Sequence, residues 1–227
     1  MVRAVIFDLD NTLVDFMSMK RLAVDAAIDA MIDAGLTLDR AGAEREIQAI
    51  YDREGIEYQR VFDDFLEAQL GYLDYRILAA GIVAYRRARE AALVLYPHVT
   101  STLMTLLKRG LRLAVVSDAP RREAWLRLCY LNLHHVFDVV VTFEDTGERK
   151  PSPAPFRLAL ERLGVAPEEA LMVGDWPERD VVGAMQAGLR TAFARYGDTF
   201  GTEHSGADFE LADAQALLEV IGELNAE

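Results

Sequence analysis

The chain has 227 residues, of which 52% are hydrophobic and 27% are charged, so it can bury a core of its own. Its 24 basic and 37 acidic residues give a net charge of −13, which opposes binding to nucleic acid or to an anionic membrane surface. An anionic substrate would therefore need a local positive site, because the overall field repels it.

Cysteine use and hydropathy indicate a reducing compartment. The one cysteine, Cys129, excludes a disulfide within the chain, and its neighbours Leu128 and Leu131 predict a small core residue. No apolar stretch is long enough to span a bilayer, and Asp8 and Asp10 interrupt the only apolar run near the start, unlike a signal peptide. The expected location is the cytoplasm.

The first predicted element is a buried strand, Ala4–Phe7, that leads directly into two carboxylates. The run is apolar and rich in β-branched and aromatic residues, as in a parallel sheet covered on both faces. Asp8 and Asp10 are two residues apart, so both lean to one side just beyond the carboxyl end of the strand. Ligands of open α/β sheets bind at that edge, and two like charges so close favour a cation between them. Hard oxygen ligands favour magnesium.

A helical block follows, because from Asp15 to about Leu93 apolar residues recur at three- and four-residue steps and no convincing strand is present. The pattern predicts four helices, with Gly35 and Gly55 ending the first two and Asp39 capping the second. The block is predicted to be an insertion into a different architecture.

Beyond Pro97, strands alternate with helices, which predicts a doubly wound parallel sheet of the α/β class. Thr100 or Ser101 is expected to cap the first of these helices. Pro120 suits the first turn of the next helix, and Asp180 is expected to open a later one. The predicted strands are 111–116, 137–142, 170–173 and 191–194, with an edge strand at 208–211. The predicted domains are a core of residues 1–14 and 96–227 and a helical cap of residues 15–95.

Polar side chains follow four of the predicted strands at the same edge of the sheet. Taken singly, each has an ordinary explanation: Ser117 could bond its own loop, Lys150 could be a surface lysine, and Asp180 could favour a helix start. Together they supply a nucleophile, an acid/base partner, a hydroxyl donor, a cation and a third carboxylate, namely Asp8, Asp10, Ser117, Lys150 and Asp175. Their convergence indicates a functional site rather than chance.

These residues resemble four motifs of the haloacid dehalogenase superfamily of phosphohydrolases, in the same order. D-L-D-N-T is similar to the first motif, V-V-S-D to the second, the lysine of R-K-P to the third and G-D-x-x-x-x-D to the fourth. The resemblance covers residues 2–14 and 96 to about 224. It implies a Rossmann-like core, with the helical block in the position of the family's first type of cap.

The resemblance also implies a reaction, namely magnesium-dependent hydrolysis of a small phosphorylated metabolite through an aspartyl-phosphate intermediate. Asp8 would be the nucleophile and Asp10 the general acid/base. The carboxylates of Asp8 and Asp175 and the backbone carbonyl of Asp10 would hold Mg²⁺. Asp180 would lie in the outer shell of the metal. The substrate phosphate would be held by Thr12, Ser117, Asp118 and Lys150.

The helical block is expected to form a lid over Asp8 that sets specificity, while the core sets the chemistry. Candidate substrate contacts are Phe16, Met17 and Lys20, which leave the hinge nearest to Asp8. The alternative is that Phe16 and Met17 pack in the cap core and that Lys20 is solvated. Trp176 departs from the family pattern, in which this position is often small and hydroxylated. Its ring would line the site or pack under the cap.

Several other functions stay open at this point. A 2-haloacid dehalogenase of the same family would use Asp8 but would not need Asp10. A phosphonate hydrolase would use a cap lysine, for which Lys20 is the one candidate. A sugar phosphomutase shares the core residues. A receiver-type phosphoacceptor module also uses acidic residues, magnesium and a lysine, but its phosphoacceptor usually lies on a later strand. The substrate, and whether the protein is a monomer or a homodimer, are not disclosed by the sequence.

Overall fold

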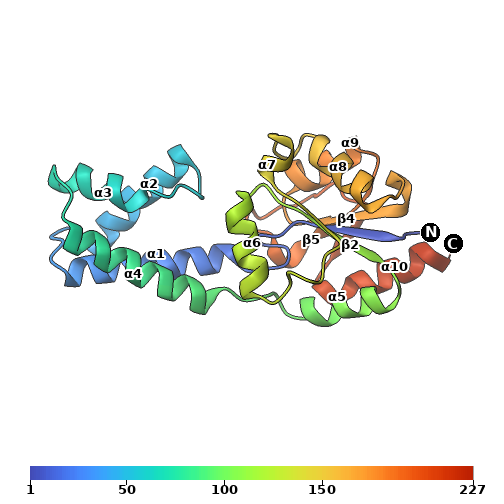
Figure 1. The fold of residues 1–227 in the computed structure, drawn as a ribbon, viewed down its shortest axis with the longest axis horizontal. Coiled ribbons are helices and arrows are strands. Elements are labelled where there is room, and N and C mark those ends of the chain that lie inside the picture. Colours follow the sequence, from blue (N-terminus) through green and yellow to red (C-terminus); the bar gives the residue numbers. More distant parts are fainter. Residues whose placement is uncertain (227) are drawn as a thin grey trace. The chain divides into compact units, whose positions relative to one another are not determined.

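The structure is a computed structural model that describes residues 1–226, and it divides into two compact units (Figure 1). The core unit contains Met1–Phe16 and Val94–Glu227, and the helical unit contains Met17–Leu93. Both divisions lie two residues from the predicted domain boundaries, which fall after residues 14 and 95.

The core unit is built on a six-stranded parallel sheet in the order β3-β2-β1-β4-β5-β6, which confirms the predicted α/β fold. Phe7, the last residue of β1, pairs with Val115 of β2 and Val173 of β4, so these three strands end nearly level. The strands are β1 Ala4–Phe7, β2 Arg112–Val116, β3 Val139–Val141, β4 Ala170–Gly174, β5 Arg190–Ala194 and β6 Phe209–Leu211.

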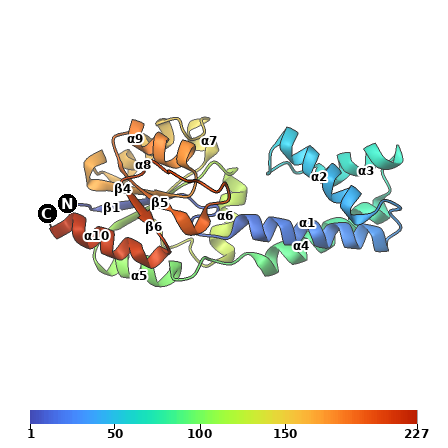
Figure 2. The same cartoon turned by 180° about the vertical axis from the view of Figure 1, so that it is seen from behind.

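Helices cover both faces of the sheet (Figures 1 and 2). On one face, Ile6, Val116 and Met172 belong to a buried cluster with Phe156 of α8 and Ala184 of α9. On the other face, α5 and α10 lie side by side in both views. The helices of this unit are α5 Val99–Lys108, α6 Arg121–Tyr130, α7 Phe143–Thr146, α8 Ala154–Leu163, α9 Val182–Gln186 and α10 Leu217–Ala226.

The predicted starts of the first two helices after Pro97 are wrong. Helix α5 begins at Val99, directly after His98, whose φ of 67° is left-handed. The Ser101 hydroxyl donates to the His98 carbonyl at 2.9 Å inside the helix, so neither Thr100 nor Ser101 is the cap. Pro120 precedes α6 as its N-cap residue instead of lying in its first turn.

The expectation that Cys129 is a core residue is also wrong, because Cys129 is exposed. Helix α6 turns Ala124, Arg127 and Leu128 toward the interior, and Cys129 falls outside that stripe. The buried side of α6 therefore contains an arginine, Arg127, and does not contain the cysteine.

The helical unit consists of four helices and contains no strand among the residues that the structure describes. The Asp39 carboxylate accepts a hydrogen bond from the Gly42 N–H at 2.6 Å and caps the second helix, as predicted. A Cβ at Gly81 would lie 2.4 Å from Met31 Cε, so glycine allows α4 to pack closely on α1. The helices are α1 Phe16–Asp33, α2 Arg40–Glu54, α3 Val61–Leu70 and α4 Tyr75–Ala92.

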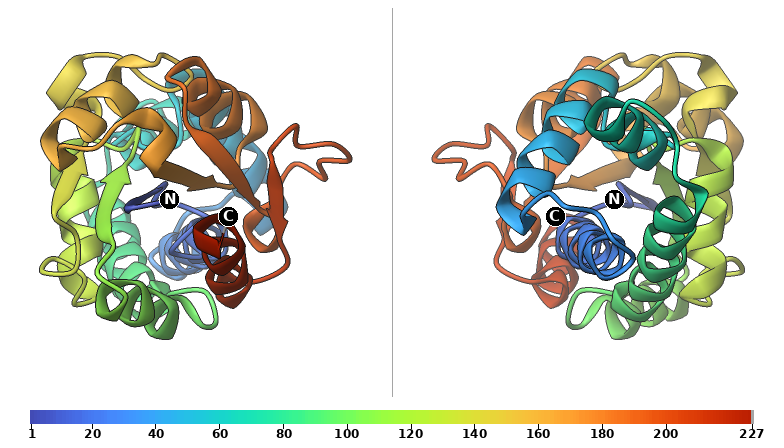
Figure 3. Two further views of the ribbon diagram at one scale, coloured as in Figure 1. Left: turned by 90° about the vertical axis from the view of Figure 1, so that its right-hand side faces the viewer. Right: turned by 90° about the vertical axis from the view of Figure 1, so that its left-hand side faces the viewer.

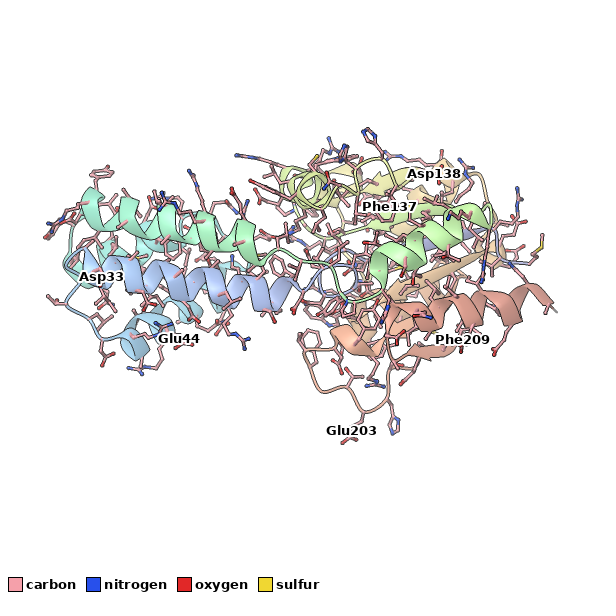
Figure 4. All side chains as sticks on the ribbon, turned by 90° about the horizontal axis from the view of Figure 1, so that it is seen from below. Asp33, Glu44, Phe137, Asp138, Glu203 and Phe209 are labelled. Atoms are coloured by element: carbon pink, nitrogen blue, oxygen red, sulfur yellow. The ribbon has the colours of Figure 1, made fainter. Side chains whose placement is uncertain are left out.

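The loop between β5 and β6 extends outward from the sheet, with Glu203 at its outer end (Figures 3 and 4). Within residues 1–226, no helix combines the length and the apolar character that crossing a membrane would require.

Candidate active site

Asp8 lies directly after β1, at the edge where the parallel strands end. Its N–H donates to the Val173 carbonyl at 2.9 Å, which ties it to β4. The level ends of β1, β2 and β4 bring the residues that follow them to this same edge.

Three carboxylates and a lysine converge there. One oxygen from each of Asp8, Asp175 and Asp180 lies within 4.8 Å of the others. The Lys150 ammonium donates to Asp8 Oδ1 at 2.5 Å and to Asp180 Oδ1 at 2.6 Å. All four residues are at most 7% exposed. The structure therefore brings together predicted site residues from the segments that follow β1, β3 and β4.

This cluster has more negative than positive charge. Burial raises the pKa of Asp8 to about 8, and the charges of Asp180 and Asp10 add to the rise while Lys150 opposes it. Burial and the charges of Asp8 and Asp180 raise the pKa of Asp175 to about 9. Burial lowers the pKa of Lys150, but Asp180 and Asp8 outweigh it, so that pKa lies above its usual value. Buried oxygen donors with unbalanced negative charge fit a divalent cation such as Mg²⁺.

Asp180 reaches the cluster from a π-helical turn, Pro177–Val181, and does not open a helix as predicted. Its Oδ2 accepts a hydrogen bond from the Trp176 N–H at 3.0 Å, while its Oδ1 accepts from Lys150. A Cβ at Gly174 would lie 2.3 Å from the Asp180 carboxyl carbon. Gly174 is therefore required for packing, because the Asp180 carboxyl group occupies the space that a side chain at Gly174 would need.

Thr12 orients Asp175. The buried Thr12 hydroxyl donates to Asp175 Oδ1 at 2.8 Å, so the prediction that it binds the substrate phosphate has no support from this contact. The Tyr196 hydroxyl donates to the Thr12 carbonyl at 2.9 Å. A Cβ at Gly197 would lie 1.6 Å from the Asn11 carbonyl oxygen. The start of the loop after β5, for which no role was predicted, thus supports the turn that follows β1.

Ser117 and Asp118 follow β2. The buried Ser117 hydroxyl oxygen accepts from the Ala119 N–H at 3.2 Å, and its hydrogen can still be donated to an anion. Asp118 Oδ1 accepts from the Lys150 backbone N–H at 2.9 Å, and its Oδ2 lies 3.2 Å from Arg179 Nη1. Asp118 therefore joins the loops after β2, β3 and β4. Since its carboxylate would repel phosphate, its predicted phosphate contact would have to come from its backbone.

Asp10 lies beside a buried arginine that the sequence analysis missed. Arg127 Nε is 3.2 Å from Asp10 Oδ1. Arg127 stands between Ala124 and Leu128 on the buried side of α6. A charged residue at a position where the helix pattern calls for an apolar one is the signal that could have found it.

Phe16 is the first of the three predicted cap contacts, and it belongs to the core unit. Its ring is buried, and its centre lies 4.6 Å from the guanidinium carbon of Arg127. The alternative that Phe16 packs in the cap core is therefore wrong.

Met17 and Lys20 belong to the helical unit. Met17 is 41% exposed, so it does not pack in the cap core either. Lys20 is only 7% exposed, so the alternative that it is solvated is wrong. Its ammonium donates to the Tyr85 hydroxyl at 3.0 Å and lies 4.3 Å from the centre of the Tyr51 ring. Contact of these residues with substrate stays a prediction.

Trp176 is held within the core unit. Its ring centre lies 3.8 Å from the guanidinium carbon of Arg179 and 4.5 Å from the ring centre of Phe200. Its indole N–H donates to Glu178 at 2.8 Å. The ring therefore packs beside the arginine that pairs with Asp118.

A parallel sheet with a buried carboxylate cluster at its carboxyl edge, bridged by a lysine, places the chain among α/β proteins that bind their ligands at that edge. The sequence pattern of the haloacid dehalogenase-like hydrolases matches residues 2–188. The chain belongs to this family, which confirms the resemblance of the motifs.

Known relatives define the reaction class. The chain is 38% identical over 230 residues to glyceraldehyde 3-phosphate phosphatase of Methanopyrus kandleri, with 99% of each chain covered. It is 32% identical over 219 residues to phosphoglycolate phosphatase of Escherichia coli, covering 88% of this chain and 84% of that one. A crystal structure of a HAD phosphatase from Thermococcus onnurineus is 28% identical, covers 97% of this chain and 98% of that chain, and has a TM-score of 0.72. The chain is a phosphoric monoester hydrolase that acts on a small phosphorylated metabolite.

Proposed function

We propose that this hydrolase works through a phosphoaspartate on Asp8. The observation that carries the proposal is the buried lysine bridge, in which Lys150 contacts both Asp8 and Asp180 beside Asp175. The ammonium orients the Asp8 carboxylate and supplies positive charge for the phosphoryl oxygens. A carboxylate nucleophile divides one difficult transfer into two easier steps.

In the first proposed step, an Asp8 oxygen attacks phosphorus and the bond from phosphorus to the leaving oxygen breaks. Asp10 gives its proton to the departing alkoxide. In the second step, Asp10 takes a proton from the water whose oxygen attacks phosphorus, and phosphate leaves as the Asp8 carboxylate is restored. Ser117 and Lys150 hold the phosphoryl oxygens during both steps.

Mg²⁺ is the proposed metal. The carboxylates of Asp8 and Asp175 and the backbone carbonyl of Asp10 would hold it, and when bound it offsets charge on the phosphoryl group. An outer position for Asp180 is supported because both of its oxygens already accept hydrogen bonds within the core unit.

The proposed substrates are small phosphorylated aldehydes or acids, because two relatives are named for glyceraldehyde 3-phosphate and phosphoglycolate. We further propose that the helical unit selects the leaving group, with Phe16, Met17 and Lys20 as the candidate contacts. Support for Lys20 comes from its burial against two tyrosines, which restricts the position of its ammonium.

A panel of phosphorylated metabolites tests the proposal, with release of inorganic phosphate measured in magnesium and in excess chelator. Phosphate release from a small aldehyde or acid phosphate is expected in magnesium. Chelation is expected to stop it, and calcium to restore it poorly, since calcium prefers more ligands at longer distance. Full activity in chelator would overturn the metal assignment. An isomerised product without free phosphate would indicate a mutase, and halide release from a haloacid would indicate a dehalogenase.

A further inference from the structure

Arg127 is a buried charged residue beside the candidate active site. The mechanism above gives it no role. Its side chain is 8% exposed on the inward side of α6. Burial of a guanidinium is costly unless it is paired, and replacing a buried ion pair with apolar residues is often neutral or stabilising. Stability of the helix alone therefore does not account for an arginine at this position.

The contacts of Arg127 span the turn that carries the proposed acid/base. Its Nε lies 3.2 Å from Asp10 Oδ1, and its guanidinium carbon lies 4.6 Å from the centre of the Phe16 ring. The second distance is one at which a cation and an aromatic face attract each other. Asp10 and Phe16 lie at opposite ends of the segment that leaves β1, so Arg127 connects both ends to α6.

The backbone of this turn is fixed by its own hydrogen bonds. The Asn11 N–H donates to the Val14 carbonyl at 2.7 Å, and the Leu13 N–H donates to the Leu9 carbonyl at 3.0 Å. These bonds place the Asp10 backbone but do not choose its side-chain rotamer. The Asp10 side chain is 22% exposed, so its contact with the arginine restrains a carboxylate that solvent reaches.

We propose that Arg127 is a positioning residue that holds the Asp10 carboxylate in the orientation that its acid/base work requires. The inference rests on the proposed function, in which Asp10 protonates the leaving alkoxide. A planar guanidinium that lies over the Phe16 ring keeps its charge at a fixed place beside Asp10, which a flexible ammonium would not. Misplacing Asp10 impairs proton transfer but leaves the attack by Asp8 intact. In kcat/KM, which reports the first step and not the later hydrolysis of the phosphoaspartate, the defect therefore depends on the leaving group.

The test compares two substrates: the alkyl phosphate that the wild type turns over fastest, and p-nitrophenyl phosphate, whose leaving group departs without a proton. Arg127→Met is expected to lower kcat/KM about ten- to a hundredfold on the alkyl phosphate and less than about threefold on the aryl phosphate. Arg127→Lys keeps the charge but not the planar fork, and is expected to recover part of the loss. Arg122→Met, at an exposed arginine of the same helix, is the matched control and is expected to change neither value.

Asp10→Asn separates failure of the inference from failure of the proposed function. Equal losses of kcat/KM on both substrates in Asp10→Asn would refute the proposed protonation of the leaving group by Asp10. A loss confined to the alkyl phosphate in Asp10→Asn, with equal losses or none in Arg127→Met, would overturn the inference alone. In kcat/KM, which reports only the first step, the double variant is expected to be no worse on the alkyl phosphate than Asp10→Asn, because both changes act through the Asp10 carboxylate. Where circular dichroism shows that Arg127→Met does not fold, Arg127→Gln and Arg127→Lys provide the same comparison.

Discussion

Among the residues described, each unit buries one lysine, and the two units hold that lysine in different ways. Lys150 of the core unit donates to two carboxylates. Lys20 of the helical unit donates to a tyrosine hydroxyl and lies against a second tyrosine ring. Carboxylates fix an ammonium at a defined point, whereas aromatic faces attract it with less directional demand. The difference fits the proposal that the core unit holds the catalytic geometry and that the helical unit serves recognition.

The largest expected effect comes from a substitution in the carboxylate cluster of the core unit. Asp8→Asn is expected to lower turnover about 10⁴-fold or more, because an amide is no nucleophile. The fold is expected to persist, since the amide oxygen can still accept from Lys150. Phosphate release, together with near-ultraviolet circular dichroism, measures both. Steady turnover in verified Asp8→Asn protein would refute the proposed mechanism.

A smaller effect is expected from substituting Lys20 in the helical unit. Lys20→Ala or Lys20→Met is expected to raise KM for a small anionic metabolite about tenfold with little change in kcat, as expected for lost ground-state binding. Activity on a small aryl phosphate is expected to change less than about twofold, because such a substrate has little for a recognition residue to hold. Lys20→Met is the better variant because it keeps most of the buried stem.

Tyr85→Phe provides a matched control for the lysine, because it removes only the hydroxyl that accepts from Lys20. A smaller rise in KM with the same substrate preference is expected. Equal effects of Lys20→Met on the metabolite and the aryl phosphate, or no effect on either, would remove Lys20 from the substrate site.

The smallest expected effect is on stability. It tests the charge of the buried carboxylates in the core unit, which the lysine site of the helical unit does not share. The folded pKa values of Asp8, about 8, and Asp175, about 9, lie above the ordinary value of 3.8. Between these limits the metal-free folded protein binds more protons than the unfolded chain, so its stability falls as pH rises. In chelator, Tm is expected to fall by roughly ten degrees between about pH 6 and pH 8.

Calorimetry with and without magnesium measures this slope. The metal replaces the protons on these carboxylates, so the fall in Tm is expected to be smaller when magnesium is present. Asp175→Asn removes one of the two titrating groups and is expected to flatten the slope in chelator. An unchanged slope in that variant would contradict the assignment of the raised pKa to Asp175.

Strands were predicted closely because each is a continuous apolar run buried on both faces. The predicted ranges 111–116, 170–173 and 191–194 correspond to Arg112–Val116, Ala170–Gly174 and Arg190–Ala194. The third strand is shorter than predicted, because the Asp138 carboxylate accepts from the Leu113 N–H at 2.8 Å ahead of Val139 (Figure 4 labels Asp138). The Asp138 side chain takes the place of a backbone acceptor for the Leu113 N–H. The pattern of apolar residues in the sequence does not predict such a replacement.

The predicted site residues with motif spacing could be placed at one sheet edge because each directly follows a strand or loop that sequence can place. Arg127, Tyr196 and Gly197 were not found, because their roles depend on contacts made by distant parts of the chain. Tyr196 bonds to Thr12 across 184 residues of sequence. Arg127 left one signal, a charge at an inward helix position, but Tyr196 and Gly197 lie in an ordinary polar loop, and only the folded arrangement shows what all three contact.

Gly197 has a consequence for redesign of the enzyme. The segment from Arg195 to Glu203 looks like a surface loop that could be exchanged freely, and its outer part does extend from the sheet (Figure 4). At Gly197, however, any side chain would overlap the Asn11 carbonyl oxygen in the turn that carries Asp10, the proposed acid/base. A grafted loop should therefore keep Tyr196 and Gly197 and begin at Asp198, which would let new recognition elements be attached without disturbing the reacting groups.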